Sequence, residues 1–349
     1  MGGSVVGVDI GLAAVRGVEV ADYGTDRPML LRYHSEPLPA GAVSRGEVLN
    51  PLVVATALKR LWAAGGFKSR SVVLGMGNHR VVARDLTVPK MSRKRIQESL
   101  PFQVQDLLSV PVAESLLDFY PISEVAGDAE TGPQITGLLI AAVKDAVLGN
   151  VAAVQRAGLT CVDVDLIPFA LSRAIHCGRT TDDVLVQIDV GAGTTSVLIT
   201  ASGVPQFVRL IPAGGDDITQ ALMVRLALDA AAAETLKLGL SLTTGAPDDP
   251  AASTLVHDVT TELLNSLRNT VTYFSNTRHT LTVDRIMLTG GGARLDGFVQ
   301  ALHGLTRLPV EAPDPWDALA VSRGVDIDAL RATEGTFLVA LGLALGSRS

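Results

Sequence analysis

Cysteines, aromatic side chains and long apolar runs are all scarce in this sequence of 349 residues. Its two cysteines, Cys161 and Cys177, are too few for a disulfide framework or a zinc site, and we expect both to be buried as small apolar side chains. The longest late apolar run, 337–345, falls well short of the roughly 20 residues that a membrane-spanning helix needs. Because Asp9 interrupts the first apolar run before a secretory signal forms, we expect a cytoplasmic protein that does not insert into a membrane.

A surplus of positive charge is also missing. The chain has 36 acidic and 29 basic side chains, which leaves a formal net charge of -7. This balance argues against a general attraction to nucleic acid or to anionic lipid. We therefore expect a specific, local partner that is not a nucleic acid.

Several common motifs of binding and catalysis are absent as well. No GxxxxGK[ST] loop is present, which excludes P-loop chemistry, and no GxGxxG follows the first strand, which disfavours a dinucleotide-binding fold. The six histidines show no metal-ligand spacing, and Ser196 does not lie in a GxSxG turn. A zinc hydrolase and a serine hydrolase therefore have no support.

What the sequence does contain is an alternation of apolar strands and helical segments, as an α/β fold requires. Its length and its 47% of hydrophobic residues are enough for two domains. Strands are expected at 5–11, 15–20, 71–76, 116–122, 136–143, 184–191 and 285–289. Helices are expected at 51–64, from Ser92 to a break at Pro101, and at 150–157, 217–238 and 255–277. The polar stretches 123–134 and 241–253 are predicted to be loops, the second with local disorder.

One motif occurs twice in the sequence and is the main indication of function. DIGLAAVRGVEV at 9–20 and DVGAGTTSVLIT at 189–200 each place an aspartate, a β-branched residue and a glycine at the end of a buried strand, before a second strand. Two such hairpins can face one another, with backbone N–H groups of the turns directed at phosphate oxygens and each aspartate reaching a hydrated magnesium ion. A single Asp-Gly at a strand end is ordinary turn chemistry, so the repetition is what favours a phosphate site.

Two further segments fit such a site. RIMLTGGGARLDGF at 285–298 is a strand followed by Gly290, Gly291, Gly292 and then a helix, an arrangement that lets a ligand approach the backbone closely. Glu234 and Lys237 lie at i and i+3 and share one face of the alanine-rich helix. Taken alone, the glycines also fit a plain tight turn, and the charged pair also fits a solvated ion pair.

These four segments, in this order and spacing, resemble the phosphate loops, ribose contact and adenosine loop of the actin, Hsp70 and sugar-kinase superfamily. Within it the chain resembles the PilM family of type IV pilus assembly. Three stretches carry that likeness, 96–120, 162–174 and 208–222, of which VRLIPAGGDDITQAL is the most telling. The resemblance implies an actin-like ATPase fold, with two ribonuclease-H-like domains around a nucleotide cleft and an inserted subdomain like that of FtsA.

The resemblance and the change in the pattern of strands and helices after residue 84 together suggest the domain boundaries. Domain I is expected to comprise 1–84, 146–180 and 325–349, the inserted subdomain 85–145, and domain II 181–324, with its helical part at about 215–280. Both ends of the chain would thus belong to the same domain.

By resemblance, the site residues form four groups. They are Asp9, Gly11 and Arg16 in the first phosphate loop, Asp189, Gly191, Gly193, Thr194 and Thr195 in the second, Glu234 and Lys237 at the nucleoside, and Gly290, Gly291 and Gly292 in the adenosine loop. ATP and Mg²⁺ are the implied cofactors, with Asp9 and Asp189 holding the metal through water.

The chain departs from the family pattern at three positions. Leu12 stands where relatives place a serine and Arg16 where they carry lysine, so the geometry of phosphate contacts must differ. In filament-forming relatives an acid precedes the proline between the domains, whereas here Ile167 precedes Pro168. Since no other general base is evident, we expect at most a slow ATPase.

The resemblance implies a cytoplasmic ATP-binding scaffold at the inner face of the cell membrane. Such a protein captures the short N-terminal cytoplasmic tail of the inner-membrane protein PilN and links the inner-membrane complex of the pilus to the motor. Two alternatives stay open. One is a small-molecule kinase on the same fold, which needs a carboxylate base in a substrate pocket, and the other is a filament-forming protein like FtsA or MreB.

Overall fold

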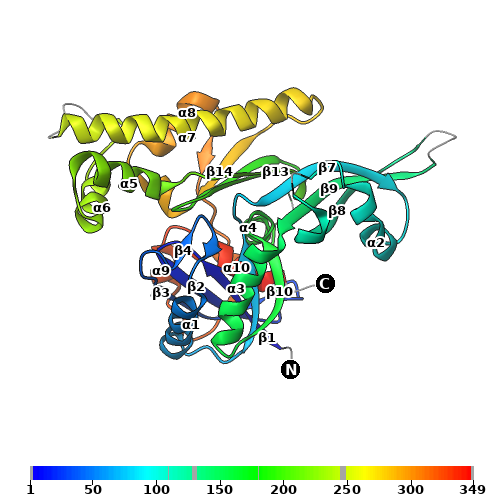
Figure 1. The fold of residues 1–349 in the computed structure, drawn as a ribbon, viewed down its shortest axis with the longest axis horizontal. Coiled ribbons are helices and arrows are strands. Elements are labelled where there is room, and N and C mark those ends of the chain that lie inside the picture. Colours follow the sequence, from blue (N-terminus) through cyan, green and yellow to red (C-terminus); the bar gives the residue numbers. More distant parts are fainter. Residues whose placement is uncertain (1–2, 109, 128–131, 180, 244–248, 347–349) are drawn as a thin grey trace.

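The computed structural model describes residues 3–108, 110–127, 132–179, 181–243 and 249–346. Two large halves, each built on its own sheet, lie one above the other, and a smaller sheet extends from their junction as an arm (Figure 1). Both ends of the described chain belong to the lower half in that view. The expected domain boundaries stay a prediction.

The first half is built on a six-stranded sheet of order β10-β6-β1-β2-β3-β16. Its strands are β1 (Ser4–Ile10), β2 (Ala14–Ala21), β3 (Met29–Pro37), β6 (Ser71–Met76), β10 (Thr160–Leu166) and β16 (Ala320–Val321). Alternate residues of β1 face opposite ways, as the pleat of a strand requires. Val6 and Val8 pack with α1 (Pro51–Gly65) and α3 (Lys144–Arg156), whereas Val5 packs with α4 (Ile167–Ile175) and α10 (Leu338–Leu345).

The second half is built on a five-stranded sheet of order β13-β12-β11-β14-β15. Its strands are β11 (Val184–Val190), β12 (Thr195–Ala201), β13 (Val204–Ile211), β14 (Arg285–Thr289) and β15 (Val310–Glu311). Three consecutive antiparallel strands are followed by two parallel ones, and β3-β2-β1-β6-β10 of the first half repeats this pattern. The two halves therefore share the topology expected of ribonuclease-H-like domains.

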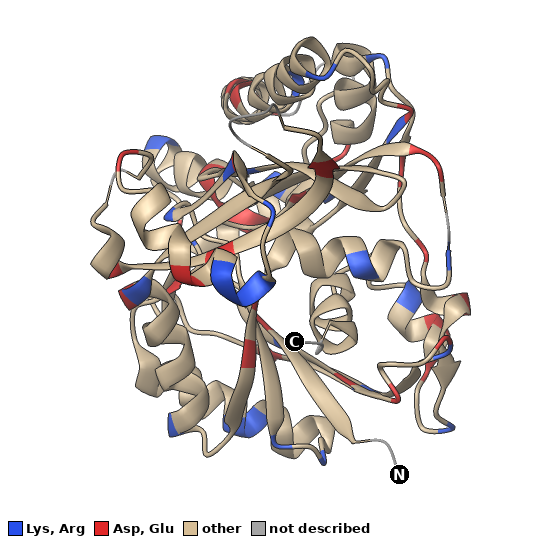
Figure 2. Cartoon of the chain, turned by 90° about the vertical axis from the view of Figure 1, so that its right-hand side faces the viewer, with Lys and Arg blue, Asp and Glu red and all other residues tan. Residues whose placement is uncertain are grey.

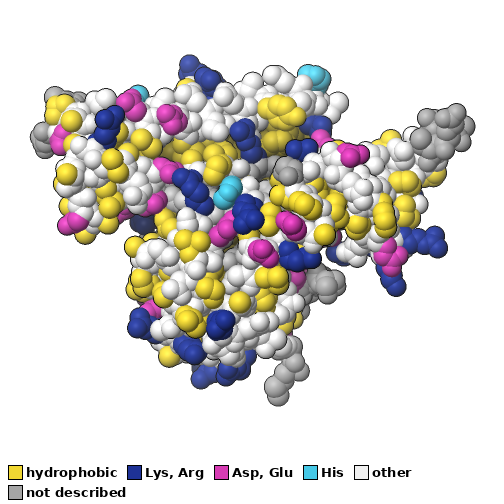
Figure 3. Space-filling model, viewed as in Figure 1, with side chains coloured by type: hydrophobic (Ala, Val, Ile, Leu, Met, Phe, Trp, Pro, Cys, Tyr) yellow, Lys and Arg dark blue, Asp and Glu magenta, His cyan; other side chains and the backbone are white. Residues whose placement is uncertain are grey.

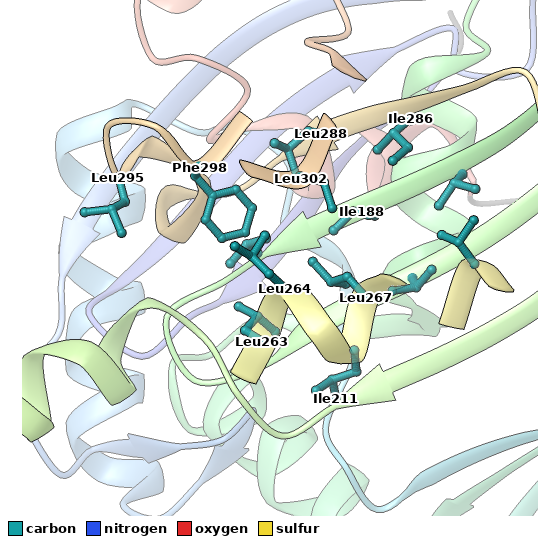
Figure 4. Packing of buried hydrophobic residues seen from close by; sticks show 14 of the residues in the cluster. Ile188, Ile211, Leu263, Leu264, Leu267, Ile286, Leu288, Leu295, Phe298 and Leu302 are labelled. Atoms are coloured by element: carbon teal, nitrogen blue, oxygen red, sulfur yellow. The ribbon is translucent and has the colours of Figure 1, made fainter. Parts of the chain in front are cut away.

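Helices cover the outer face of the second sheet. They are α5 (Gly215–Leu226), α6 (Ala230–Leu238), α7 (Pro250–Thr277) and α8 (Phe298–Thr306). Buried residues of α7 recur every three or four positions, so one stripe of this long helix faces the sheet. Figure 4 shows Leu264 and Leu267 of this stripe beside Ile188 and Phe298 in the core of the second half.

The arm consists of a three-stranded sheet of order β7-β9-β8 and of α2 (Arg93–Gln103). Its strands are β7 (Val81–Pro89), β8 (Ser115–Val125) and β9 (Gln134–Val143). The edge strand β13 of the second half packs against β7, where Val208 joins a buried cluster with Val81 and Leu138. An ion pair between Arg278 and Asp85 at 2.5 Å adds a second tie between the arm and the second half.

Shorter elements complete the described chain. They are β4 (Val43–Ser44), β5 (Glu47–Val48), α9 (Ile327–Arg331) and three 3-10 helices at Val112–Glu114, Gly291–Arg294 and Trp316–Ala318. Among the described residues, no helix is both long and apolar enough to span a membrane. Basic and acidic residues are interspersed over the molecule in Figure 2, without a large area of either sign.

Several expectations about the elements are wrong in detail. Helix α2 continues through Pro101 to Gln103, because a proline in the last turn removes only one helical hydrogen bond. The helix expected at 217–238 is two helices, since Asp229 caps a new start by accepting from the N–H of Ala232. Both cysteines are half-buried and not fully buried. The expected disorder at 241–253 includes residues 244–248, which lie outside the described residues.

Candidate functional site

The two repeated hairpins have the same backbone geometry. Asp9 is the last residue but one of β1, opposite Arg16, and Asp189 is the last residue but one of β11, opposite Ser196. Two residues after each aspartate, the glycine N–H donates to the carbonyl three residues on, from Gly11 to Ala14 and from Gly191 to Thr194, at 3.0 Å in both cases. The sequence echo is therefore a structural repeat.

The two aspartates lie close enough for each to affect the other's charge. Burial, followed by the negative charge of Asp9, raises the pKa of Asp189 to about 6, although hydrogen bonding from Thr289 opposes this rise. Burial also raises the pKa of Asp9, against the lowering effect of Arg16 at 3.5 Å. Two neighbouring carboxylates with raised pKa values form a site where a divalent cation would relieve the repulsion.

Arg16 brings positive charge to the same place. Its guanidinium lies over the first turn, with Nη1 3.2 Å from the position of a Cβ at Gly11. Its Nε is buried and has no hydrogen-bond partner among the described residues. An unpaired buried donor is costly unless a ligand satisfies it, and phosphate oxygens match the planar guanidinium.

The glycines of the second half let three segments meet without side chains. A Cβ at Gly214 would lie 2.4 Å from the carbonyl oxygen of Gly191, and one at Gly290 would lie 2.3 Å from that of Val190. Gly290 also has a φ of +94°, which side chains disfavour. A Cβ at Gly291, in contrast, would meet nothing within 4 Å, so the backbone there faces open space.

The two threonines of the second turn have different surroundings. Thr195 is fully buried, and its hydroxyl donates to the carbonyl of Ala213 at 2.7 Å. This bond ties the turn to the segment before α5. Thr194 is half-buried, beside Gly191 and Gly193, and it is better placed than Thr195 to meet a ligand.

Glu234 and Lys237 are anchored at the start of α5. The ammonium of Lys237 donates to the carbonyl of Gly215 at 3.2 Å, to the hydroxyl of Thr219 at 2.9 Å and to Glu234 at 2.6 Å. Burial raises the pKa of Glu234, but hydrogen bonds from Lys237 and Thr219 outweigh it, so the pKa is lowered. The side chain of Lys237 is only 13% exposed. Lys237 and Glu234 are therefore not simply a solvated ion pair on the surface.

The residues present fit a hydrated magnesium ion with phosphate groups. Among the described residues, no cluster of three or more His, Cys, Asp or Glu side chains is arranged to hold a metal. Magnesium keeps several of its waters and needs only one or two carboxylates, which Asp9 and Asp189 would supply. The paired turns and Arg16 would hold the phosphates.

The position directly before Pro168 carries no general base. Ile167, directly before Pro168, packs on the first sheet, where a Cβ at Gly77 would lie 2.9 Å from its Cδ1. An aliphatic side chain cannot accept a proton from water. The expectation of slow hydrolysis at most stays a prediction.

Sequence reasoning missed two residues that support the site. Thr289 donates to Asp189 at 3.0 Å, and Thr219 donates to Glu234 at 2.7 Å. Thr289 ends the strand before the three glycines, so pairing that strand in parallel with the strand at 184–190 would have placed it beside Asp189. The sequence holds no comparable signal for Thr219.

Comparisons with known proteins agree on one family. A family model described as "Type IV pilus assembly protein PilM" matches residues 7–348. Among solved structures, a "PilM-PilN type IV pilus biogenesis complex" superposes with a TM-score of 0.83 at 30% identity, covering 98% of this chain and 97% of that one.

More distant proteins are similar in structure or in part of the sequence. MreB 5 of Spiroplasma citri bound to AMPPNP matches with a TM-score of 0.51 at 12% identity, covering 95% of this chain and 96% of that one. The cell division protein FtsA of Bacillus subtilis is 25% identical over 188 residues, which are 49% of this chain and 43% of FtsA. The match thus spans less than half of FtsA.

Proposed function

The chain belongs to the PilM family of type IV pilus assembly proteins and has an actin-like fold, and from this premise we propose that it is an ATP-binding scaffold that captures the N-terminal tail of a PilN-type protein. In this proposal, nucleotide binding fixes the arrangement of the two halves. The arm then presents the tail-binding surface. Assembly, and not catalysis, is the main role.

The observation that carries the nucleotide proposal is the pair of aspartates between two equivalent turns. Holding two half-buried carboxylates close together destabilises the protein unless a cation joins them, and the raised pKa of Asp189 reflects that cost together with its burial. Arg16 supplies a buried donor without a partner beside the same pair. MreB 5, which shares the fold, is described as bound to AMPPNP. Together these features favour a magnesium nucleotide.

The chain's own residues would divide the work of binding. Asp9 and Asp189 would hold the hydrated ion, and the N–H groups of the two turns would meet the phosphates. Lys237 fixes the start of α5 beside the glycines, at the place proposed for the nucleoside. When bound, magnesium would neutralise the carboxylates and the phosphates together.

The proposal for the partner rests on the arm and on the family. The matched solved structure is a PilM-PilN complex. In this chain, a cavity of about 190 Å³ lies along β7 and β9, with Arg80 and Arg84 beside Leu107, Leu108 and Val143. Figure 3 shows hydrophobic side chains gathered over the arm, with basic ones at its lower edge. Such a surface suits a short peptide that carries apolar and polar side chains.

Capture of a PilN tail would place the protein at the inner face of the cell membrane, where it would join the inner-membrane complex to the motor. The test is a binding titration with a synthetic peptide of the N-terminal cytoplasmic residues of the same organism's PilN, with and without Mg²⁺ and ATP. We expect saturable binding that Mg²⁺ and ATP strengthen. An intact, nucleotide-saturated protein that does not bind the peptide would contradict the scaffold role.

A further inference from the structure

The hairpin formed by β4 and β5 carries an unusual residue at its tip. The two central residues of its turn are Arg45, with φ +45°, and Gly46, with φ +81°. A two-residue turn with both φ angles positive favours Asn, Asp or Gly at the first position, because other side chains are strained there. A residue held in a strained conformation points to a role that outweighs the strain.

The base of this hairpin is fixed to the first half. The N–H of Val48 donates to Asn150 Oδ1 of α3 at 3.2 Å, and Glu47 pairs with Arg80 at 3.3 Å. Gly46 lies against Asn78, whose Cβ would be 3.1 Å from a Cβ at that glycine. The tip therefore moves with the first half.

The side chain of Arg45 reaches the second half. Its guanidinium donates to the carbonyl of Pro212 and pairs with Asp217 Oδ1, the latter at 3.2 Å. Its Cα lies 3.5 Å from the position of a Cβ at Gly193, so the tip of the hairpin lies directly over the second turn. In Figure 1, β4 lies at the top of the lower half, facing the upper half.

Asp217 connects this contact to the proposed phosphate site. Its other carboxylate oxygen accepts from the N–H of Gly214 at 2.8 Å, and Gly214 packs against the carbonyl of Gly191. One carboxylate thus joins Arg45, the start of α5 and the second turn. A change in the position of Arg45 would therefore affect the start of α5 and the second turn.

We propose that Arg45 is an interdomain clasp, which ties the first half to the start of α5 and so slows the opening of the halves and the release of a bound nucleotide. The part that concerns nucleotide release rests on the function proposed above. The side chains of Arg45 and Asp217 are 44% and 32% exposed, so salt screens their attraction. The clasp is therefore sensitive to ionic strength.

Arg45→Asn is the decisive variant, because asparagine suits the turn and cannot span to Asp217. Glu47→Gln is its matched control, since it removes an ion pair of the same hairpin that does not reach the second half. The measurement is the dissociation rate of a fluorescent ATP analogue with Mg²⁺ in the full chain. Arg45→Asn loses one exposed ion pair and one charged hydrogen bond, which should speed release about three- to tenfold. The release rate of Glu47→Gln should stay near that of the wild type.

Two further results are expected from the same assay. Added salt should speed release more from the wild type than from Arg45→Asn, which lacks the exposed ion pair. Asp217→Asn keeps an acceptor oxygen for Gly214, and its effect should not add to that of Arg45→Asn, because both variants remove the same ion pair. Equal release rates in the wild type and Arg45→Asn would overturn the role in nucleotide release.

A second readout does not depend on the nucleotide. Fluorophores are attached at Lys59→Cys on α1 and Gln220→Cys on α5, both exposed, in a background in which Cys161 and Cys177 are replaced by serine. In the ligand-free protein, energy transfer should show a longer mean distance between the two fluorophores, or a broader distribution of that distance, in Arg45→Asn than in Glu47→Gln. Unchanged distances would overturn the clasp. A wild type that binds no nucleotide would overturn the proposed function, and this distance measurement would then decide the clasp alone.

Discussion

Thr289 donates a hydrogen bond from Oγ1 to Oδ1 of Asp189 at 3.0 Å, across the paired strands β14 and β11. This bond favours the ionised form of a carboxylate whose burial and proximity to Asp9 favour the protonated form. The balance leaves the pKa of Asp189 at about 6, close to neutral pH. The charge state of the proposed metal site is therefore sensitive to small changes around it.

Replacing Thr289 by valine should push the pKa of Asp189 higher. Valine keeps the shape of threonine and removes the donor, so the proton competes more strongly with magnesium at pH 7. We expect the affinity for Mg²⁺ and ATP at pH 7 to fall about two- to tenfold, given the usual strength of a hydrogen bond to a charged group. The affinity should recover near pH 8.5, and titrations at the two pH values check this. Parallel pH profiles for the variant and the wild type would contradict the role given to Thr289.

Asp189→Asn should stabilise the ligand-free protein at neutral pH. The pKa is raised in the folded state, so that state binds more protons than the unfolded one between pH 3.8 and about 6. Stability contributed by this group is therefore lost as the pH rises through that window, and the loss is complete above it. The variant should gain about 3 kcal/mol at pH 7 and nothing near pH 3.5. Thermal melts across this range test it, and a variant less stable at pH 7 would refute the electrostatic account.

Gly290 and Gly291 make a matched pair for the glycine segment. Gly290→Ala places a Cβ 2.3 Å from the carbonyl oxygen of Val190 and strains a φ of +94°. It should cost about 2 kcal/mol of stability or more. Gly291→Ala meets nothing within 4 Å and should change stability by less than about 0.5 kcal/mol. Urea unfolding without ligand compares the two, and equal losses would show that the segment is packed differently.

The arm can be tested separately from the nucleotide site. Arg84→Glu reverses a charge at the cavity along β7 and β9, and should weaken binding of the PilN peptide at least about fivefold. Arg93→Glu changes an exposed arginine at the start of α2, which is not among the residues that line the cavity, and serves as the control. Both variants should keep the same stabilisation by Mg²⁺ and ATP. A stronger effect of Arg93→Glu would move the peptide surface to α2.

Local patterns of the sequence predict the parts of the fold that depend on periodicity. The two Asp-x-Gly hairpins are recognisable because a buried strand, an acid and a glycine turn recur in the same order at 9–20 and 189–200. Near-continuous runs of apolar residues likewise mark the strands at 71–76 and 184–190, which are buried on both faces. These features are set by neighbours along the chain.

Features that depend on distant contacts could not be predicted. The tie between Arg45 and Asp217 joins residues that are 172 positions apart. The pairing of Thr289 with Asp189 depends on which strands lie side by side. Pro101 led to the wrong prediction that the helix breaks there. The free-energy cost of a proline in a helix depends on how close it lies to the end of the helix, here α2. Each case needs the tertiary arrangement, which a single sequence does not display.

A thermal melt with and without millimolar Mg²⁺ and ATP, for the wild type and for Asp189→Asn, tests the central claim most directly. At about 100 times the dissociation constant, binding should stabilise the wild type by about 2.7 kcal/mol, which is a rise of several degrees. Asp189→Asn should melt higher than the wild type without ligand and should not respond to it. A wild type whose melting temperature is the same with and without Mg²⁺ and ATP would contradict the claim that the two aspartates form a nucleotide site.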